Sequence, residues 1–557
     1  MSDSLLRFPA LLWLKKEAAP CHSWHPLLFA VVAASAMTLM FNEAFFQALQ
    51  HHIPGQFGLQ LSLLALVFLL NLLLVLLFGQ GRALKPVVLM LFFAGAAASY
   101  FQHSFGVVLD KDMLQNALET DSAEARGLLS LDLIWHLAQW MAFPVLLCVV
   151  ARIQGQSWRQ RLLHSAAATA VVLLSVAALG AAQFNELAPF FRNYRDVKHL
   201  ALPVSPVIAA SSLAAKQLKA AVPQQFEVLA RDASRPAAVA GQKPKLLVLV
   251  LGETARADHF KLNGYERDTT PLLDQLPVYS FASVSSCGTA TAHSVPCMFS
   301  VQNRDNYDET VAKNSSNVLD ILAATGVDAY WLDNNSGCKG VCDRLPSEFL
   351  FEQPDPRCTG GQCLDSVLLD ALKQQLSVAQ TNTAVDRIIV LHQLGSHGPE
   401  YFRRSAAADK HFLPECTDKQ IQLCAPEQII NAYDNSIVAT DQLLASVIAE
   451  LGQQTGYDSA MLYLSDHGES LGENGVYLHG LPYWMAPEAQ THIPMIWWMS
   501  ADEADTELLD KDCLKQQQQQ PLSQDYLFHT LLGFFNVSTS LYQSRLDFLA
   551  PCRRGDL

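Results

Sequence analysis

The stretch LLVLVLGETARADHF, residues 246–260, decides the fold of the C-terminal half of the chain. Its run of Leu and Val predicts a buried parallel strand, because strands covered on both faces are apolar along their whole length. The run ends at Gly252, so that Glu253 lies at the C-terminal end of the strand. Open α/β sheets place their chemistry at that edge, and Glu253 is therefore a candidate functional residue.

Two further stretches supply complementary chemistry. SSCGTATAHSVPCMFS, residues 285–300, offers threonine hydroxyls beside a predicted helix start. AMLYLSDHGES, residues 460–470, is another strand pattern and includes Asp466 and His467 directly after its apolar run. Carboxylate, imidazole and hydroxyl groups together suit a zinc ion with an activated threonine.

Strand patterns alternate with helical patterns throughout this half, which predicts a mainly parallel sheet covered by helices. The predicted strands are KLLVLVLG (245–252), VDAYWLD (327–333), RIIVLHQLG (387–395), SAMLYLSD (459–466) and HIPMIWWMS (492–500). The predicted helices lie within residues 316–326, 364–379 and 426–451, and the glutamines at 516–520 are expected to form a solvated loop.

Polar side chains follow four of these strands. Glu253 follows the first, Asp333-Asn334-Asn335 the second, His397 the third and Asp466-His467 the fourth. Because the carboxyl ends of parallel strands meet at one edge of a sheet, we expect these groups to converge.

A catalytic zinc takes a mixed oxygen and nitrogen shell and leaves one position open for substrate. Glu253, Asp466 and His467 can fill three positions, which leaves Thr291 or a substrate oxygen for the fourth. Coordination to a dication activates a hydroxyl that is a poor nucleophile at neutral pH. Thr291 would also lie near a helix N-terminus, where free N–H groups stabilise a phosphate.

Each of these residues also has a purely structural explanation. Asp466-His467 could cap a turn, and Glu253 could pair with Arg256. Thr291, like Thr289, could be an ordinary N-cap residue. The joint pattern, rather than any single residue, favours the metal site. Isolated histidines are more often structural than catalytic, and that is the expectation for His259, His293 and His411.

The first third of this 557-residue chain is nearly all apolar. Five segments have the length of about 20 residues that crosses a bilayer, namely residues 27–48, 58–79, 84–104, 130–152 and 162–183. The predicted organisation is a transmembrane domain of five helices over residues 1–183, interfacial helices and a linker over 184–243, and a catalytic domain over 244–557.

Lys and Arg are enriched in cytoplasmic loops, and their distribution fixes the orientation. One set of loops carries Arg7, Lys15, Lys16, Arg82, Lys85, Arg152, Arg159 and Arg161, and the opposite set carries only Lys111 and Arg126. The N-terminus is therefore expected inside and the catalytic domain outside.

Ten of the twelve cysteines lie beyond residue 280, and Cys21 and Cys148 are the exceptions. An even number of cysteines in an exported domain predicts disulfides. Pairing by proximity along the chain gives Cys287 with Cys297, Cys338 with Cys342, Cys358 with Cys363 and Cys416 with Cys424, which leaves Cys513 and Cys552. The formal net charge of −15, with no basic stripe, argues against a nucleic-acid partner.

Several motifs in fixed order resemble the lipid A phosphoethanolamine transferases, a branch of the alkaline-phosphatase and sulfatase superfamily. They are GETARADHFKLNGYERDTTP, CGTATAHSVPCMFS, DNNSGCKGV, GSHGP, SDHGESLGENGVYLHG and HIPMIWW. The resemblance covers essentially the whole chain. It implies a zinc ion held by Glu253, Thr291, Asp466 and His467, with Thr291 as the nucleophile.

The resemblance also implies roles around the transferred group. His397 and His479 match histidines near the phosphate, where they bind a second zinc or assist proton transfer. Asn335 and Lys339 match a pair that contacts the phosphoethanolamine group. The Cys338–Cys342 pair around this lysine is not found in every member of the family.

The implied activity is transfer of phosphoethanolamine from phosphatidylethanolamine to a lipid A phosphate through a phosphoethanolamine-threonine intermediate. The implied setting is a monomer in the Gram-negative inner membrane, with a periplasmic catalytic domain and resistance to polymyxin as the outcome. The alternatives are a core sugar or a periplasmic glucan as acceptor, or a transporter with a ligand-binding domain. Sulfate ester hydrolysis is disfavoured, because neither Cys287 nor Cys297 has the sequence context for conversion to formylglycine.

Overall fold

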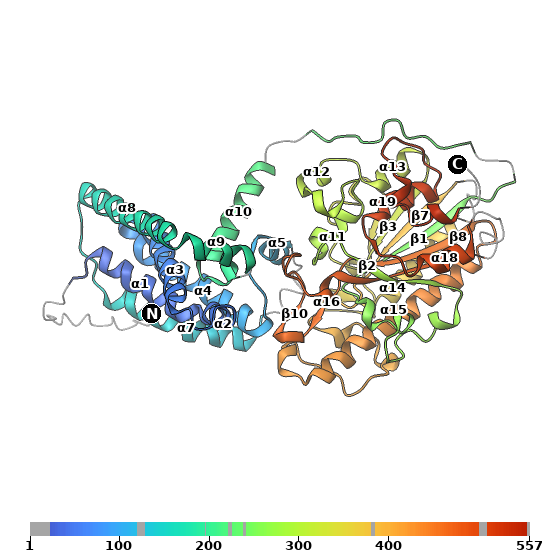
Figure 1. Cartoon of the computed structure of the whole chain (residues 1–557). Helices are drawn as coiled ribbons and strands as arrows, with labels where there is room; N and C mark the ends of the chain where they lie inside the picture. Colours follow the sequence, from blue (N-terminus) through green and yellow to red (C-terminus); the bar gives the residue numbers. More distant parts are fainter. Residues whose placement is uncertain are drawn as a thin grey trace, which may run out of the picture. The chain divides into compact units, whose positions relative to one another are not determined.

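The structure is a computed structural model that describes residues 23–119, 129–194, 197–220, 225–237, 241–379, 385–500 and 509–553. It has two compact units (Figure 1). The first unit reaches to Ala96 and includes His136–Val197 and Ala201–Val204. The second consists of Ala97–Trp135, Lys198–Leu200 and the chain from Ser205 onward. Cys21 lies outside the described residues, and the domain boundaries expected from the sequence stay a prediction.

The apolar N-terminal region is helical. Its helices are α1 (Pro26–Phe41), α2 (Glu43–His52), α3 (Phe57–Phe78), α4 (Leu84–Phe105), α7 (Leu131–Val150) and α8 (Trp158–Ala182). Four helices in the described part of the chain are long and apolar enough to cross a membrane, and the number reaches five if the bent pair α1 and α2 forms one span.

The bend between α1 and α2 was not expected, because the hydropathy of residues 27–48 is continuous. The two helices meet at 63°. Asn42 lies at the break, fully buried, and its Nδ2 donates to Thr38 O at 3.1 Å and to Leu202 O at 2.9 Å. Its Oδ1 accepts from Leu202 N at 2.8 Å. The bond to Thr38 O satisfies a carbonyl at the end of α1 that has no helical partner, and the two bonds to Leu202 attach the break to a distant segment of the chain.

Two helices follow the apolar region. They are α9 (Phe184–Asn193) and α10 (Val204–Ala220), and both overlap segments that were expected to be helical. Their position at a membrane surface stays a prediction.

An eight-stranded sheet forms the centre of the second unit. Its strands lie in the order β12 (Leu522–Ser523), β2 (Tyr279–Ser285), β11 (His492–Met499), β8 (Asp458–Ser465), β1 (Lys245–Gly252), β7 (Arg387–His392), β3 (Asp328–Asp333) and β4 (Ser347–Phe349). Among the described pairings of this sheet, only those of β11 with β2 and β8 are antiparallel. The prediction of a mainly parallel sheet is confirmed.

Helices cover both faces of this sheet (Figure 1). One face packs against α11 (Thr291–Met298), α13 (Val318–Ala324) and α19 (Tyr526–Phe534), and the other against α14 (Ser366–Ala379) and α15 (Pro426–Gly452). Alternate residues of β1 serve the two cores, with Leu247 and Leu249 on one side and Leu246 and Val248 on the other. This two-residue period explains why the strand is apolar throughout.

The remaining elements of the second unit are short. The helices are α5 (Lys111–Glu119), α12 (Glu309–Lys313), α16 (Glu488–Thr491) and α18 (Lys511–Gln517), and the small hairpins are β5–β6 (Cys358–Thr359 and Gln362–Cys363) and β9–β10 (Ser470–Leu471 and Tyr477–Leu478). The end of α18 includes two of the glutamines that were expected in a loop.

The register of the strands aligns their C-terminal ends at one edge of the sheet. Gly252 is opposite Ser465, so that Glu253 and Asp466 follow neighbouring strands at the same level. Asp333 is opposite His392 on the other side of β1. The side chains that follow β1, β8, β7 and β3 therefore leave the sheet at one edge.

Five disulfides constrain the loops of this unit. They join Cys287 to Cys297, Cys338 to Cys342, Cys358 to Cys363, Cys416 to Cys424 and Cys513 to Cys552. The last pair spans 39 residues and ties α18 to the end of the described chain.

One buried histidine in α19 gives the fold a pH dependence. His529 is buried, and its Nδ1 accepts a hydrogen bond from Gln543 N at 3.2 Å. Burial, with a smaller contribution from Arg545, lowers the pKa of His529 to about 4. The unfolded chain binds a proton at this site below about pH 6.5. Between about pH 6.5 and about pH 4 protons therefore favour unfolding, and stability falls as the pH falls.

We expect His529→Asn, which keeps an acceptor near the position of Nδ1, to weaken this dependence. The check is thermal unfolding of the full-length protein in detergent across the same pH window. The variant should lose less melting temperature than the wild type on acidification. If the melting temperatures of the two proteins fell equally with pH, His529 would not be the source of the pH dependence.

Candidate active site

Four side chains that are far apart in the sequence converge at the sheet edge. Thr291 Oγ1 donates to Glu253 Oε2 at 2.9 Å and lies 3.3 Å from His467 Nε2. His467 Nε2 lies 3.4 Å from Glu253 Oε1 and 3.3 Å from Asp466 Oδ2. Glu253, Asp466 and His467 are fully buried.

Two carboxylate oxygens at this point have no hydrogen-bond partner among the described residues. They are Glu253 Oε1 and Asp466 Oδ2, both buried. His467 Nδ1 faces Gly468 O at 2.9 Å, so it carries the proton and leaves the Nε2 lone pair toward the carboxylates. A buried acceptor without a partner costs free energy. A cation bound by these two oxygens and by His467 Nε2 would remove that cost.

The electrostatics agree with a cation site. Burial, together with the neighbouring Asp466 carboxylate, raises the pKa of Glu253 well above its ordinary value. Burial lowers the pKa of His467, which favours the neutral ring that a metal requires. Without a cation, two buried carboxylates oppose each other's ionisation. The oxygen and nitrogen donors fit zinc.

Thr291 is held at the first position of α11. The N-cap is Ala290, so neither Thr291 nor Thr289 is an N-cap residue. The hydroxyl of Thr289 instead donates to Leu481 O at 2.6 Å.

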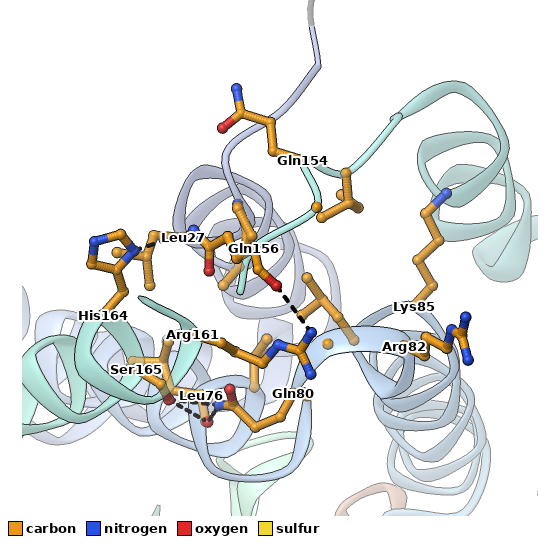
Figure 2. A pocket seen from close by; sticks show the side chains of 18 residues that line it. Leu27, Leu76, Gln80, Arg82, Lys85, Gln154, Gln156, Arg161, His164 and Ser165 are labelled. Atoms are coloured by element: carbon orange, nitrogen blue, oxygen red, sulfur yellow. Dashed lines mark hydrogen bonds between the residues drawn. The ribbon is translucent and has the colours of Figure 1, made fainter. Parts of the chain in front are cut away.

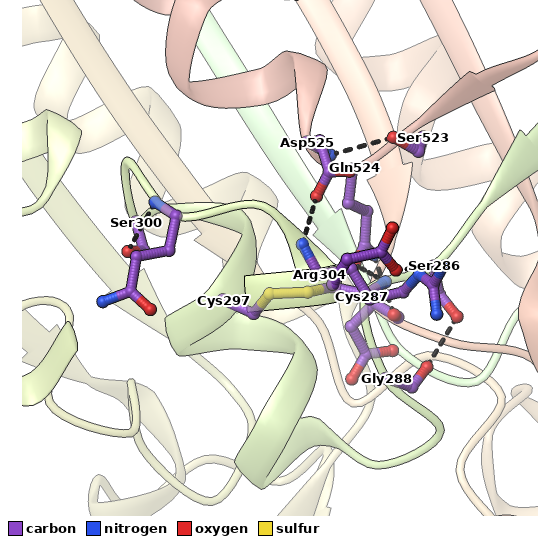
Figure 3. Close-up of a disulfide and its surroundings, with 12 residues drawn as sticks. Ser286, Cys287, Gly288, Cys297, Ser300, Arg304, Ser523, Gln524 and Asp525 are labelled. Atoms are coloured by element: carbon purple, nitrogen blue, oxygen red, sulfur yellow. Dashed lines mark hydrogen bonds and ion pairs between the residues drawn. A yellow bond between two sulfur atoms is a disulfide. The ribbon is translucent and has the colours of Figure 1, made fainter. Parts of the chain in front are cut away.

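The Cys287–Cys297 disulfide brackets this turn (Figure 3). Cys287 N donates to the side chain of the buried Gln524 at 2.6 Å, which anchors the loop to the start of α19. Because the two cysteines are joined to each other, neither is available for conversion to formylglycine.

A second group of ligand-type side chains adjoins the first. His467, Glu469 and His479 place one ligand atom each within 4.8 Å of one another. His479 Nδ1 lies 2.7 Å from Glu469 Oε2, and Tyr401 donates to Glu469 Oε1 at 2.6 Å. The rings of His467 and His479 are 4.5 Å apart.

His397 adjoins the same group. Its ring centroid is 5.2 Å from that of His479, and its Nδ1 lies 2.7 Å from Gly398 O. Burial, and then the neighbouring His479, lowers the pKa of His397 well below its ordinary value. The structure therefore brings both predicted histidines beside the four-residue cluster.

Asn335 and Lys339 occupy the loop after β3. Asn335 Nδ2 donates to Glu253 Oε2 and to Gln393 O, both at 2.8 Å, so it orients the carboxylate. Lys339 Nζ donates to Ser336 Oγ at 2.8 Å. Asn335 thus contacts the cluster, whereas Lys339 contacts its own loop.

The sequence interpretation missed the residues behind the site. Glu469 lies two residues after His467 and was the one missed residue with a local signal. Asp365 is half-buried and accepts from Leu394 N and Gly395 N, both at 2.8 Å. Asp333 was predicted at this edge, but its buried partner His392, at 2.9 Å, was not. No pattern in the sequence marks such long-range partners.

The purely structural roles considered for Glu253 and His259 can be compared with the structure. Arg256 pairs with Asp258 at 2.7 Å and with Glu473 at 2.5 Å rather than with Glu253. His259 pairs with the buried Asp434 at 2.7 Å, which fits the structural role expected for it.

Comparison with known proteins agrees with this architecture. The Sulfatase family model matches residues 245–537, and the family model for phosphoethanolamine transferase EptA/EptB matches residues 66–218. Phosphoethanolamine transferase EptA of Escherichia coli (strain K12) is 39% identical over 84% of this chain and 86% of its own length. Phosphatidylethanolamine transferase Mcr-1 of Escherichia coli is 36% identical over 97% of this chain and 99% of its own length.

A solved structure extends the similarity to both units. The integral membrane lipooligosaccharide phosphoethanolamine transferase A (EptA) from Neisseria meningitidis matches with a TM-score of 0.89 and 34% identity, over 95% of this chain and 99% of that one. These relatives are transferases, which favours an enzyme over a transporter. By sequence, family models and fold, the chain belongs to the membrane-anchored phosphoethanolamine transferases of the sulfatase superfamily.

Proposed function

We propose that this protein transfers phosphoethanolamine from phosphatidylethanolamine to a phosphate group of lipid A, with Thr291 as the nucleophile. The observation that carries the proposal is the convergence of the Thr291 hydroxyl with two partnerless buried carboxylate oxygens. The family membership supports the reaction class.

The residues that would hold zinc are Glu253, Thr291, Asp466 and His467. Bound there, zinc would supply a Lewis acid that activates the threonine hydroxyl and offsets charge on the phosphoryl oxygens. Asn335 keeps the Glu253 carboxylate in place through its 2.8 Å hydrogen bond. The group formed by Glu469 and His479 with His467 is the candidate for a second ion.

In the first step, Thr291 Oγ1 bonds to the phosphorus of phosphatidylethanolamine, and the bond from phosphorus to the diacylglycerol oxygen breaks. The hydroxyl proton passes toward Glu253 Oε2, which already accepts it as a hydrogen bond. The leaving diacylglycerol oxygen takes a proton from His479, whose Nδ1 lies 2.7 Å from Glu469 Oε2, and the proton that the acceptor phosphate loses in the second step returns to His479 through solvent. Phosphoethanolamine remains ester-linked to Thr291.

In the second step, an oxygen of a lipid A phosphate bonds to the same phosphorus, and the bond to Thr291 breaks. The threonine oxygen recovers its proton from Glu253. Thr291 is the first residue of α11, and a helix N-terminus favours a phosphate beside it.

Both substrates are lipids, which accounts for a catalytic unit joined to membrane helices. We place the N-terminus in the cytoplasm and the catalytic unit in the periplasm, as the distribution of Lys and Arg indicates. The product carries a zwitterion where lipid A had a bare phosphate. Cationic peptides such as polymyxin should then bind less well.

The acceptor is tested by expressing the full-length protein in a Gram-negative host that lacks phosphoethanolamine transferases. We expect lipid A from these cells to gain the mass of one phosphoethanolamine. The Thr291→Ala variant serves as the matched control. Unmodified lipid A with phosphoethanolamine on a core sugar or a periplasmic glucan would show that the acceptor is wrong.

A further inference from the structure

A polar cavity lies at one end of the first unit, where α3 connects to α4 and α7 connects to α8 (Figure 2). Its volume is about 440 Å³. The start of α1 closes one side, and Trp24 pairs with the connection to α8 through Arg152 O at 2.7 Å. The cavity is thus built from three separate parts of the bundle.

The lining of this cavity is cationic. Arg82 comes from the short turn before α4, Lys85 from the first turn of α4 and Arg161 from the first turn of α8, and Figure 2 labels all three. Lys85 Nζ also donates to Cys148 O at 2.5 Å. The described residues that line the cavity include no Asp or Glu. Arg161 Nη2 donates to Gln156 O at 3.4 Å, the one hydrogen bond of its side chain to the described residues, and a guanidinium has five N–H donors. The site suits an anion with several oxygen acceptors.

An apolar groove continues from the cavity along α3 and α8. It has a volume of about 630 Å³ and includes Leu77, Leu162 and Leu173. The two spaces share Leu76, Gln80, Arg161 and Ser165. Trp158 lines the groove at the first residue of α8, as expected for an aromatic side chain at a membrane interface.

We propose that the cavity and the groove together bind one anionic phospholipid, with its headgroup phosphate among Arg82, Lys85 and Arg161 and an acyl chain along the groove. Basic pockets between membrane helices are known to select acidic headgroups. A zwitterionic lipid fits less well, because its ammonium would find no carboxylate in the described lining. This lipid site belongs to the first unit, whereas Thr291 and the proposed donor site belong to the second. By the distribution of Lys and Arg the lipid site faces the cytoplasmic leaflet.

Native mass spectrometry of the full-length protein in detergent tests this site. The protein is offered equal amounts of phosphatidylglycerol and phosphatidylcholine with the same acyl chains. We expect the wild type to retain phosphatidylglycerol preferentially. Each neutralised cation should weaken that binding roughly fivefold, so Arg82→Gln/Arg161→Gln should nearly abolish the preference. Arg82→Gln alone, at an exposed residue, is the milder variant if the double variant unfolds.

Arg159→Gln is the matched control, because Arg159 is exposed on the same turn of α8 and is outside the lining of both spaces. It should keep the wild-type preference. Ala166→Phe fills the groove without changing charge and should also weaken phosphatidylglycerol binding.

Three results would overturn the proposal. The first is a wild type with no preference between the lipids. The second is an equal loss in Arg159→Gln, which would indicate general surface charge. The third is displacement of the lipid by inorganic phosphate together with full binding in Ala166→Phe, which would indicate a free-anion site.

Discussion

Replacing Thr291 with alanine is expected to reduce phosphoethanolamine transfer by about ten-thousandfold or more. The hydroxyl is the group at the cluster that can form the proposed ester, and enzymes that lose their nucleophile lose catalysis on this scale. Turnover of a fluorescent phosphatidylethanolamine by the purified full-length protein measures the effect. Binding of the lipid should remain, because the alanine removes no charged group.

Two variants control for damage to α11. Thr291→Ser keeps a hydroxyl at the same position and should retain measurable activity. Ser294→Ala changes a buried hydroxyl one turn along the helix, and Ser294 Oγ has no hydrogen-bond partner among the described residues. Ser294→Ala should therefore be close to the wild type. Loss of activity in Ser294→Ala equal to that in Thr291→Ala would point to a folding defect instead of a lost nucleophile.

Neutralising a carboxylate of the cluster is expected to remove bound zinc and to lower activity by about a hundredfold or more. Glu253→Gln and Asp466→Asn keep the shape of each side chain and remove one of the two partnerless oxygens as an anionic ligand. Elemental analysis of the purified full-length protein measures the zinc content.

A chelator separates loss of metal from loss of fold. Zinc that binds the folded state stabilises it, so chelation should lower the melting temperature of the wild type. It should leave Glu253→Gln unchanged, because that variant holds no zinc. Glu473→Gln is the matched control, since Glu473 pairs with Arg256 outside the cluster. A Glu253→Gln protein with a full complement of zinc would contradict the ligand assignment.

The functional edge of the sheet was predictable because each strand, and the polar residue that follows it, can be recognised from a short stretch of sequence. The strands β1, β3, β7 and β8 are short apolar runs, and parallel strands end at one edge. That rule predicted that Glu253, Asp466 and His467 lie together. In the structure, His467 Nε2 lies 3.4 Å from Glu253 Oε1 and 3.3 Å from Asp466 Oδ2. The direction of β11 was not predictable, since an apolar strand has the same composition in either direction.

Other features depend on contacts between distant residues. The bend at Asn42 is stabilised by hydrogen bonds to Leu202, 160 residues away. The hydropathy of the sequence is continuous across the bend and therefore does not predict it. The strand β2 alternates too weakly to stand out, because Ser280 and Ser285 interrupt it. Arg256 forms an ion pair with Glu473, which lies 217 residues away in the sequence. Sequence spacing carries no information on such pairs.

The most direct measurement is mass spectrometry of the intact protein and its peptides after incubation with phosphatidylethanolamine in the absence of acceptor. The account predicts a mass gain of one phosphoethanolamine on the peptide that contains Thr291, and no gain in Thr291→Ala. Addition of lipid A should remove the adduct from the wild type. Transfer to lipid A by a Thr291→Ala protein, or an adduct on another residue, would contradict the central claim.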